Sequence, residues 1–201
     1  GADELTKQKF ENNSELANIL GNLVHRTLKF LERYFDSKIP FSKDLAPIDK
    51  RLLEEAFKIK DKIKNHYEKF EVRKVCFELM ELGRLGNKYF DEKAPWASVK
   101  NNISDCNNAM STLCKLLQLI SVCAYPVIPE SGSKLWKMLG FKEELKNIKW
   151  IDFNENFNPE NNKLGLIETL FNKIDEKEIE EEIELLKKAL DKKQEIKKMI
   201  Y

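Results

Sequence analysis

Residues 104–124 are the stretch that most restricts how this chain can fold. Their apolar residues recur with helical spacing, and from Leu113 onward the stretch is apolar on most sides. A helix without a polar face needs cover all round, so it belongs at the centre of a helical bundle. No apolar run in the sequence reaches the ~18 residues of a membrane-spanning helix, so we expect no association with a membrane.

Helical periodicity extends over most of the remaining sequence. The first apolar stripe starts after Ser14, a candidate N-cap, and reaches Tyr34. Further patterns predict helices over residues 48–66, 71–89, 131–139 and 175–198. The intervening stretches are rich in proline or asparagine and predict loops. Because no range carries a convincing strand pattern, the expected fold is all-α, an antiparallel helix bundle.

Two glycines, Gly83 and Gly86, interrupt the helix expected over residues 71–89. Each costs roughly 1 kcal/mol of helix propensity. Glycine inside a helix is expected where a second helix approaches closely, since it has no side chain in the way. The two positions therefore predict a close helix–helix contact.

The composition argues against several kinds of function. A net charge of +1 gives no overall attraction for nucleic acid, so any such binding needs a local patch. The four cysteines contain no CxxC pair, and neither His25 nor His66 has a partner at metal-ligand spacing, so no metal site is expected. Because the sequence has neither a Gly-rich phosphate loop nor a nucleophile–base arrangement, we expect no catalytic residue and no cofactor.

Two features could nevertheless form a binding site. Asn18, Asn22 and Arg26 are spaced i, i+4, i+8, which places them in one row beside the apolar stripe. Amide and guanidinium groups in a row can hydrogen-bond the edges of unstacked bases, but such a row can equally be an ordinary solvated face. Trp96, held by the stiff backbone of Pro95, is either a core side chain or an exposed ring on which a base stacks.

Four segments of the sequence resemble the anticodon-binding domain of methionyl-tRNA synthetases. They are SELANILGNLVHRTLKF, NKYFDEKAPW, YPVIPESGSKLW and LFNKID, which occur in the family's order over about residues 14–175. The resemblance implies a helix bundle of the class I aminoacyl-tRNA synthetase anticodon-binding type. It also implies that the domain recognises the methionine anticodon, CAU, in the anticodon loop of tRNA(Met).

The resemblance assigns roles to particular residues. Asn22 and Arg26 match the residues of the family's first helix that read bases, and Asn18 lies one turn before them. Trp96 matches the tryptophan that stacks beneath the first anticodon base, and Pro95 matches the proline that holds it. These five residues are therefore the expected anticodon-binding residues.

The resemblance also implies what surrounds the domain. Because the sequence has no HIGH-like or KMSKS-like signature and opens with Gly-Ala, we expect a fragment of a cytoplasmic methionine–tRNA ligase without its ATP- and methionine-binding catalytic domain. Residues 1–170 would form the anticodon-binding domain, and residues 171–201 a C-terminal return segment with a charged helix or linker. In the family LFNKID packs against the catalytic domain, so Leu170, Phe171 and Ile174 are expected to contact it.

Two other functions remain open. The bundle could belong to a related class I synthetase, such as the cysteine or valine enzyme, although the combination of Asn22, Arg26 and the Pro95–Trp96 pair argues against this. The third possibility is a helical scaffold for protein–protein interaction, which the acidic run at residues 176–184 would favour.

Overall fold

The computed structural model describes residues 2–150, 152–154, 157–171, 181, 184 and 192–201 of the 201-residue chain. The elements are α1 (Ala2–Tyr34), α2 (Pro47–Glu68), α3 (Val72–Lys93), α4 (Pro95–Asn101), α5 (Ile103–Ala124), α6 (Pro129–Met138), the 3-10 turn η1 (Leu145–Asn147) and α8 (Lys192–Ile200). In this described part of the chain, the only β-type pairing outside helices is an isolated antiparallel bridge between Lys38 and Lys163. The all-α prediction is confirmed.

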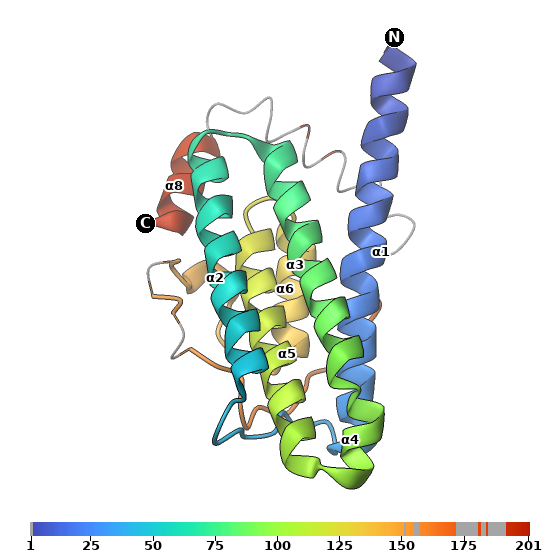
Figure 1. Ribbon diagram of the computed structural model, residues 1–201. Coiled ribbons are helices and arrows are strands. Elements are labelled where there is room, and N and C mark those ends of the chain that lie inside the picture. The colour runs from blue at the N-terminus through green and yellow to red at the C-terminus, as the bar shows by residue number, and fades with distance from the viewer. Residues whose placement is uncertain (1, 151, 155–156, 172–180, 182–183, 185–191) are drawn as a thin grey trace.

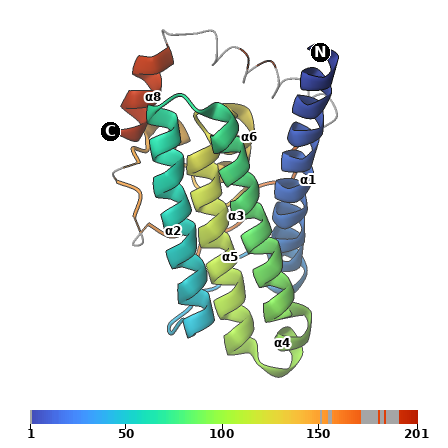
Figure 2. The same cartoon turned by 45° about the horizontal axis from the view of Figure 1, so that its top comes forward.

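The long helices stand side by side and alternate in direction along the chain (Figure 1). Helix α3 lies between α1 and α2, and it contacts both of them as well as α5. Figure 2 shows the same order of helices from a second direction. Because α2 returns the chain between them, α1 and α3 run parallel to each other, which determines how their side chains pair.

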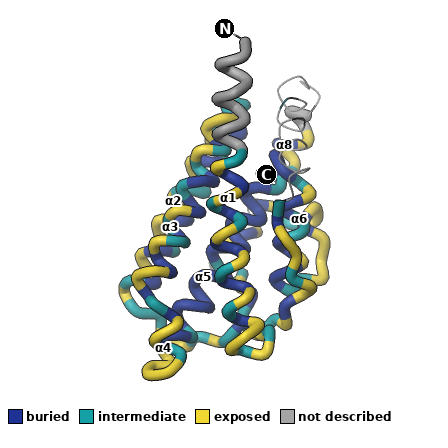
Figure 3. Tube along the Cα trace, turned by 90° about the vertical axis from the view of Figure 1, so that its right-hand side faces the viewer, coloured by how far each residue is buried: buried dark blue, intermediate teal, exposed yellow. Residues whose placement is uncertain are grey.

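Helix α5 is the central helix of the bundle, as its sequence predicts. Its side chains are buried almost continuously from Cys106 to Ala124, and Figure 3 shows the helix in dark blue behind α1. The helix begins at a capped end, where the side chain of Asn102 accepts a hydrogen bond from the Asp105 backbone N–H (3.2 Å). A helix that contacts α1, α2, α3 and α6 has no face left for water.

The two glycines of α3 lie at the close contact that the sequence predicts. A Cβ atom added to Gly83 would lie 2.5 Å from Cγ2 of Ile19, and one added to Gly86 would lie 2.5 Å from Cδ2 of Leu23. Both partners belong to α1. The absence of two side chains therefore lets α1 and α3 approach each other closely over their middle turns.

Two predicted helix ends were wrong. Helix α1 begins at Ala2, well before Ser14, because residues 2–13 are mostly good helix formers and a helix can continue beyond its apolar stripe. Helix α3 continues past residue 89 to Lys93 and ends at Ala94, which has the left-handed φ of 45°. The following proline disfavours a helical Ala94 and starts the short helix α4 as its first residue.

The chain after α6 returns across the bundle in irregular structure. Gly140, with a φ of 86°, follows α6 as expected for a residue after a helix end. Residues 37–39 and 161–164 then form a backbone clasp, in which Leu164 N–H donates to Ser37 O (2.7 Å) and Ile39 N–H donates to Asn162 O (3.0 Å). The clasp attaches the residues that follow α1 to the distant residues 161–164.

The C-terminal helix predicted over residues 175–198 lies largely outside the described residues. Its described end, α8, lies beside the C-terminal end of α2 (Figures 1 and 2). Ile196 and Ile200 are buried there, and the backbone N–H of Trp150 donates to the backbone carbonyl of Met199 (3.2 Å). Across the described residues, no helix combines the length and the apolarity that crossing a membrane requires.

Candidate functional site

The parallel register of α1 and α3 pairs polar side chains across the two helices. Asn22 Nδ2 donates to Asn87 Oδ1 (3.1 Å), and one turn later Arg26 donates to Asp91 Oδ1 (2.5 Å). The two residues in each pair are 65 positions apart. Asn87 also donates to the Ile19 carbonyl (3.2 Å), which fixes the orientation of its amide. Asn22 and Arg26 are thus each held by a partner on α3.

Arg26 is held by an aromatic ring in addition to its ion pair. The guanidinium carbon lies 4.1 Å from the ring centroid of Phe90, a buried residue of α3. Such a cation–π contact orients the guanidinium plane. Arginine has five N–H donors, and Arg26 remains partly exposed beside Asp91. The arrangement therefore leaves donors of a positioned guanidinium available to a ligand.

Trp96 packs against the same aromatic ring, Phe90. Its ring centroid is 6.1 Å from that of Phe90, with 31° between the planes, and half of the residue (50%) is exposed. Pro95 is buried beneath it as the first residue of α4. The sequence left a core side chain and an exposed ring as alternatives. The exposure shows that Trp96 is not a core side chain.

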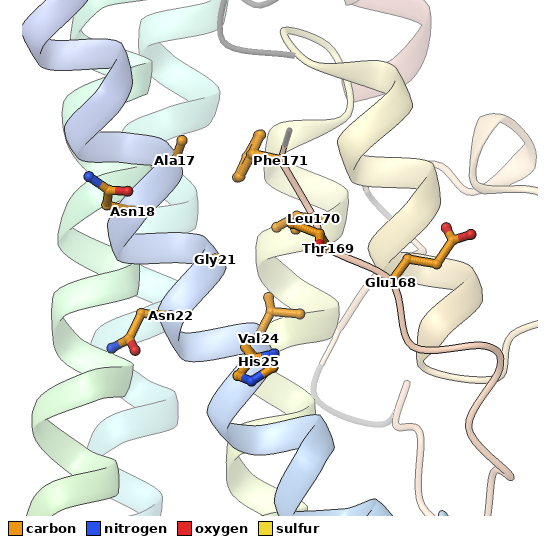
Figure 4. Close-up of a pocket in the computed structure, with 10 residues that line it drawn as sticks. All are labelled: Ala17, Asn18, Gly21, Asn22, Val24, His25, Glu168, Thr169, Leu170 and Phe171. Carbon is orange, nitrogen blue, oxygen red and sulfur yellow. The ribbon is translucent and has the colours of Figure 1, made fainter. Parts of the chain in front are cut away.

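We call these five residues, Asn22, Arg26, Asn87, Asp91 and Trp96, the rim cluster. The structure brings three of the predicted site residues into it and buries a fourth, Pro95, as their support. Asn18 is exposed one turn before Asn22, and Figure 4 shows both amides pointing to the same side of α1. Asn18 therefore extends the row but lies farther from the ring.

A pocket of about 240 Å³ lies between α1 and residues 168–171, and its lining includes both Asn18 and Asn22 (Figure 4). His25 also lines this pocket, although its ring points in a different direction from the amides of Asn18 and Asn22. Leu170 is only 4% exposed because it packs into the core of this bundle. Leu170 therefore has little surface left for the predicted contact with a catalytic domain. Phe171 is half-buried, and Ile174 lies outside the described residues.

The sequence interpretation missed Asn87, Phe90 and Asp91, although the segment NKYFDEKAPW contains all three. The available signal was spacing. Asn87 and Asp91 are four positions apart, as are Asn22 and Arg26. When two helices run parallel and close together, two such pairs can face each other turn by turn. Gly83 and Gly86 predicted the closeness, but nothing in the sequence set the register.

The rim cluster can bind a ligand but offers no group for covalent chemistry. It presents amide, carboxylate and guanidinium groups beside one half-exposed ring, which suits a flat ligand with polar edges. Among the described residues, no group of His, Cys, Asp and Glu has the arrangement of a metal site. Burial raises the pKa of the Cys123 thiol to about 12, which keeps it protonated and unreactive.

Comparison with known proteins connects this geometry to a family. Residues 39–187 match the family described as the anticodon binding domain of methionyl tRNA ligase. Methionine–tRNA ligase of Protochlamydia amoebophila is 32% identical over 173 residues, which are 85% of this chain and 25% of that protein. The enzyme of Metallosphaera sedula is also 32% identical, over 90% of this chain and 32% of its own length.

A solved structure has the same fold. The crystal structure of the apo form of Mycobacterium tuberculosis methionyl-tRNA synthetase superposes with a TM-score of 0.61 at 25% identity. The match covers 66% of this chain and 28% of that one. The chain thus spans about a quarter to a third of the length of these relatives.

Proposed function

The chain belongs to the family of anticodon-binding domains of methionyl tRNA ligases, and we propose that it recognises the anticodon CAU in the loop of tRNA(Met). In this proposal it is one module of a cytoplasmic methionine–tRNA ligase. ATP and methionine bind to the catalytic domain of the longer enzyme, and the module itself needs no cofactor. Alone, it forms no methionyl-adenylate, so it catalyses no methionine-dependent pyrophosphate exchange.

The exposed half of the Trp96 ring is the observation that carries the proposal. Pro95 is buried and Phe90 backs the indole, so the ring is held in place before any ligand arrives. A base that stacks on a fixed aromatic ring gains about 1–3 kcal/mol. We assign this contact to the first anticodon base.

Arg26 and Asn22 supply the polar contacts to base edges. The guanidinium of Arg26 and the indole of Trp96 both lie against Phe90, so the two groups share one aromatic support. Asp91 and Asn87 hold the two side chains through the hydrogen bonds described above. Because Asp91 is exposed and Arg26 is partly exposed, the ion pair contributes little to stability and can rearrange when a base binds. Asn18 extends the same face by one turn.

Residues 168–171 border a second surface for the longer enzyme. Leu170 anchors this segment to the bundle, which leaves Phe171 half-buried at the edge of the pocket beside α1. We propose that the catalytic domain contacts Phe171, and Ile174 beyond it, rather than Leu170.

Titration with anticodon stem-loops tests the proposal. The purified chain is added to fluorescently labelled stem-loops that carry CAU or the same loop with its first base changed, and anisotropy gives the dissociation constants. Loss of the preferred first base should weaken binding by about 1–3 kcal/mol, or about 5- to 150-fold.

Stem-loops with the cysteine and valine anticodons serve as controls for the related class I synthetases. Equal affinity for CAU and for the changed loops would contradict the proposal. Tighter binding of the cysteine or valine stem-loop would support the corresponding class I synthetase instead. Absence of all RNA binding would favour a protein-interaction scaffold.

A further inference from the structure

A buried charged cluster lies at the end of α3, two residues after Asp91, and takes no part in the contacts proposed above. Lys93, the last residue of α3, has a side chain that is only 5% exposed. Its ammonium lies 3.0 Å from Asp49 Oδ1 and 2.5 Å from Asp105 Oδ1. A buried lysine is rare in proteins and needs such partners. Its presence at this position calls for an explanation.

The carboxylates that hold Lys93 come from two other helices. Asp49 is fully buried in the first turn of α2, where its second oxygen accepts the Ala46 N–H (2.8 Å) and its first oxygen accepts the hydroxyl of Tyr89. Asp105 belongs to the first turn of α5. One ammonium group thus joins the ends of α2, α3 and α5.

The ammonium stays charged in this setting. Burial opposes the charge on Lys93, but the hydrogen bonds to Asp105 and Asp49 outweigh burial and raise the pKa of the amine above its ordinary value. A buried ion pair of this kind adds little stability compared with apolar packing, and its best-documented use is to fix one arrangement of the surrounding elements.

The backbone between Lys93 and Trp96 has little freedom. Ala94 is held in the left-handed region (φ 45°, ψ 59°), and the ring of Pro95 fixes the next φ angle. The Ala94 carbonyl accepts from the N–H groups of Ala97 and Ser98 (2.9 and 3.2 Å). Movement of the end of α3 is therefore passed directly to the indole.

From this geometry we propose that Lys93 is a positioning residue for Trp96. By fixing the end of α3 to Asp49 and Asp105, it sets the orientation in which the exposed indole meets a base. The proposal rests on the stacking role assigned above and adds the group that orients the ring. Lys93 itself contacts no RNA, because its ammonium is enclosed by the two carboxylates.

A double-mutant cycle separates positioning from general stabilisation. Lys93→Met and Trp96→Ala are made singly and together in the 201-residue chain, and each is titrated with the CAU stem-loop. Lys93→Met should weaken binding about tenfold, within the contribution of one stacked base. In the Trp96→Ala background the same change should weaken binding less than about twofold, since the ring to be oriented is gone.

An RNA-free measurement reports on the ring itself. The chain is labelled with 5-fluorotryptophan, and the 19F resonance of Trp96 is assigned by its loss in Trp96→Phe. Lys93→Met should shift and broaden this resonance while those of the buried Trp136 and Trp150 stay in place. This readout needs no assumption about the ligand. A failure of CAU binding by the parent would therefore refute the proposed function, and the 19F spectrum would still decide the positioning role.

Two further variants distinguish the positioning of Trp96 from a general loss of stability. Asp105→Asn removes the partly exposed carboxylate and leaves the buried Lys93–Asp49 pair intact. This variant should therefore fold even if Lys93→Met does not. It should show a smaller loss of affinity for CAU and a smaller shift of the Trp96 resonance than Lys93→Met. Tyr67→Phe removes a buried hydrogen bond to the Cys123 carbonyl and should lower the melting temperature without moving Trp96. Equal losses of affinity in both Trp96 backgrounds, or an unchanged Trp96 resonance in the folded variants, would overturn the proposal.

Discussion

Replacing Trp96 with alanine tests whether the ring serves binding or packing. The residue is 50% exposed, so of the roughly 250 Å² of a tryptophan side chain about 125 Å² is buried. At about 25 cal/mol per Å² this burial is worth roughly 3 kcal/mol, and a compact unfolded chain reduces the figure to about 2 kcal/mol. Trp96→Ala should therefore lower the melting temperature by about 4–8 °C.

The effect on RNA should be distinct from this loss of stability. At a temperature where parent and variant are both folded, Trp96→Ala should weaken binding of the CAU stem-loop by about 1–3 kcal/mol. Circular dichroism during heating gives the stability, and anisotropy titration gives the affinity. A fully buried tryptophan such as Trp136, at 1% exposure, should instead cost about 3–5 kcal/mol of stability.

Phe77→Ala is the matched control. Phe77 is exposed to a similar extent (53%), but it lies on α3 and precedes Phe90 by 13 positions, or about 20 Å of helix. Its replacement should leave RNA affinity unchanged. The reasoning would be refuted if Trp96→Ala bound CAU as well as the parent. It would also be refuted if the variant lost as much stability as a buried tryptophan.

Four further outcomes are expected. Arg26→Ala should cost no more than about 1–2 kcal/mol of stability, because it loses an exposed ion pair and one cation–π contact, yet it should reduce the affinity ratio between CAU and base-changed stem-loops. Gly86→Val should lower the free energy of unfolding by about 1–3 kcal/mol through overpacking. At Gly21 an added Cβ meets nothing within 4 Å, so Gly21→Ala should be neutral or stabilising. Chemical denaturation measures both effects. Burial raises the pKa of Tyr67 and Cys114 in the folded chain. As pH rises, the unfolded chain therefore loses these protons before the folded chain does, and the free energy of unfolding should fall above about pH 9. In Tyr67→Phe this fall should be shallower by up to about 1.4 kcal/mol per pH unit. With a net charge of +1, the dependence of log affinity on log salt should be shallow, about that of a few phosphate contacts, and a slope near ten contacts would reveal a basic groove.

The fold was predictable where one physical requirement dominated. The apolar helix at 104–124 can only be covered on all sides, and it is the central helix. Glycine at positions 83 and 86 is explained by a close helical neighbour, and α1 is that neighbour. The end of α3 was not predictable in the same way. A charged Lys93 looks like the end of a helix in the sequence, and only the distant Asp49 and Asp105 make its burial possible.

The residues of the site were likewise predictable only in part. Asn22, Arg26 and Trp96 were found because helical spacing and a resemblance both pointed to them. Their partners Asn87 and Asp91 lie in the same quoted segment as Trp96, but their role depends on the register between two helices, which is a tertiary property. Local patterns report which face of a helix is polar, and they do not report what that face meets.

The clasp between residues 37–39 and 161–164 has a consequence for the order of events during folding. Lys163 donates to the Asp36 carbonyl at the edge of the clasp, across a separation of 127 positions. Contacts so far apart in sequence form slowly, and the α1–α3 pairs, which are 65 positions apart, should form sooner. We infer that α1 docks on α3 first and that its end is fastened last. The same end should be the first part of α1 to open in the native state, so amide exchange there would reveal a local opening that leaves Arg26 in place.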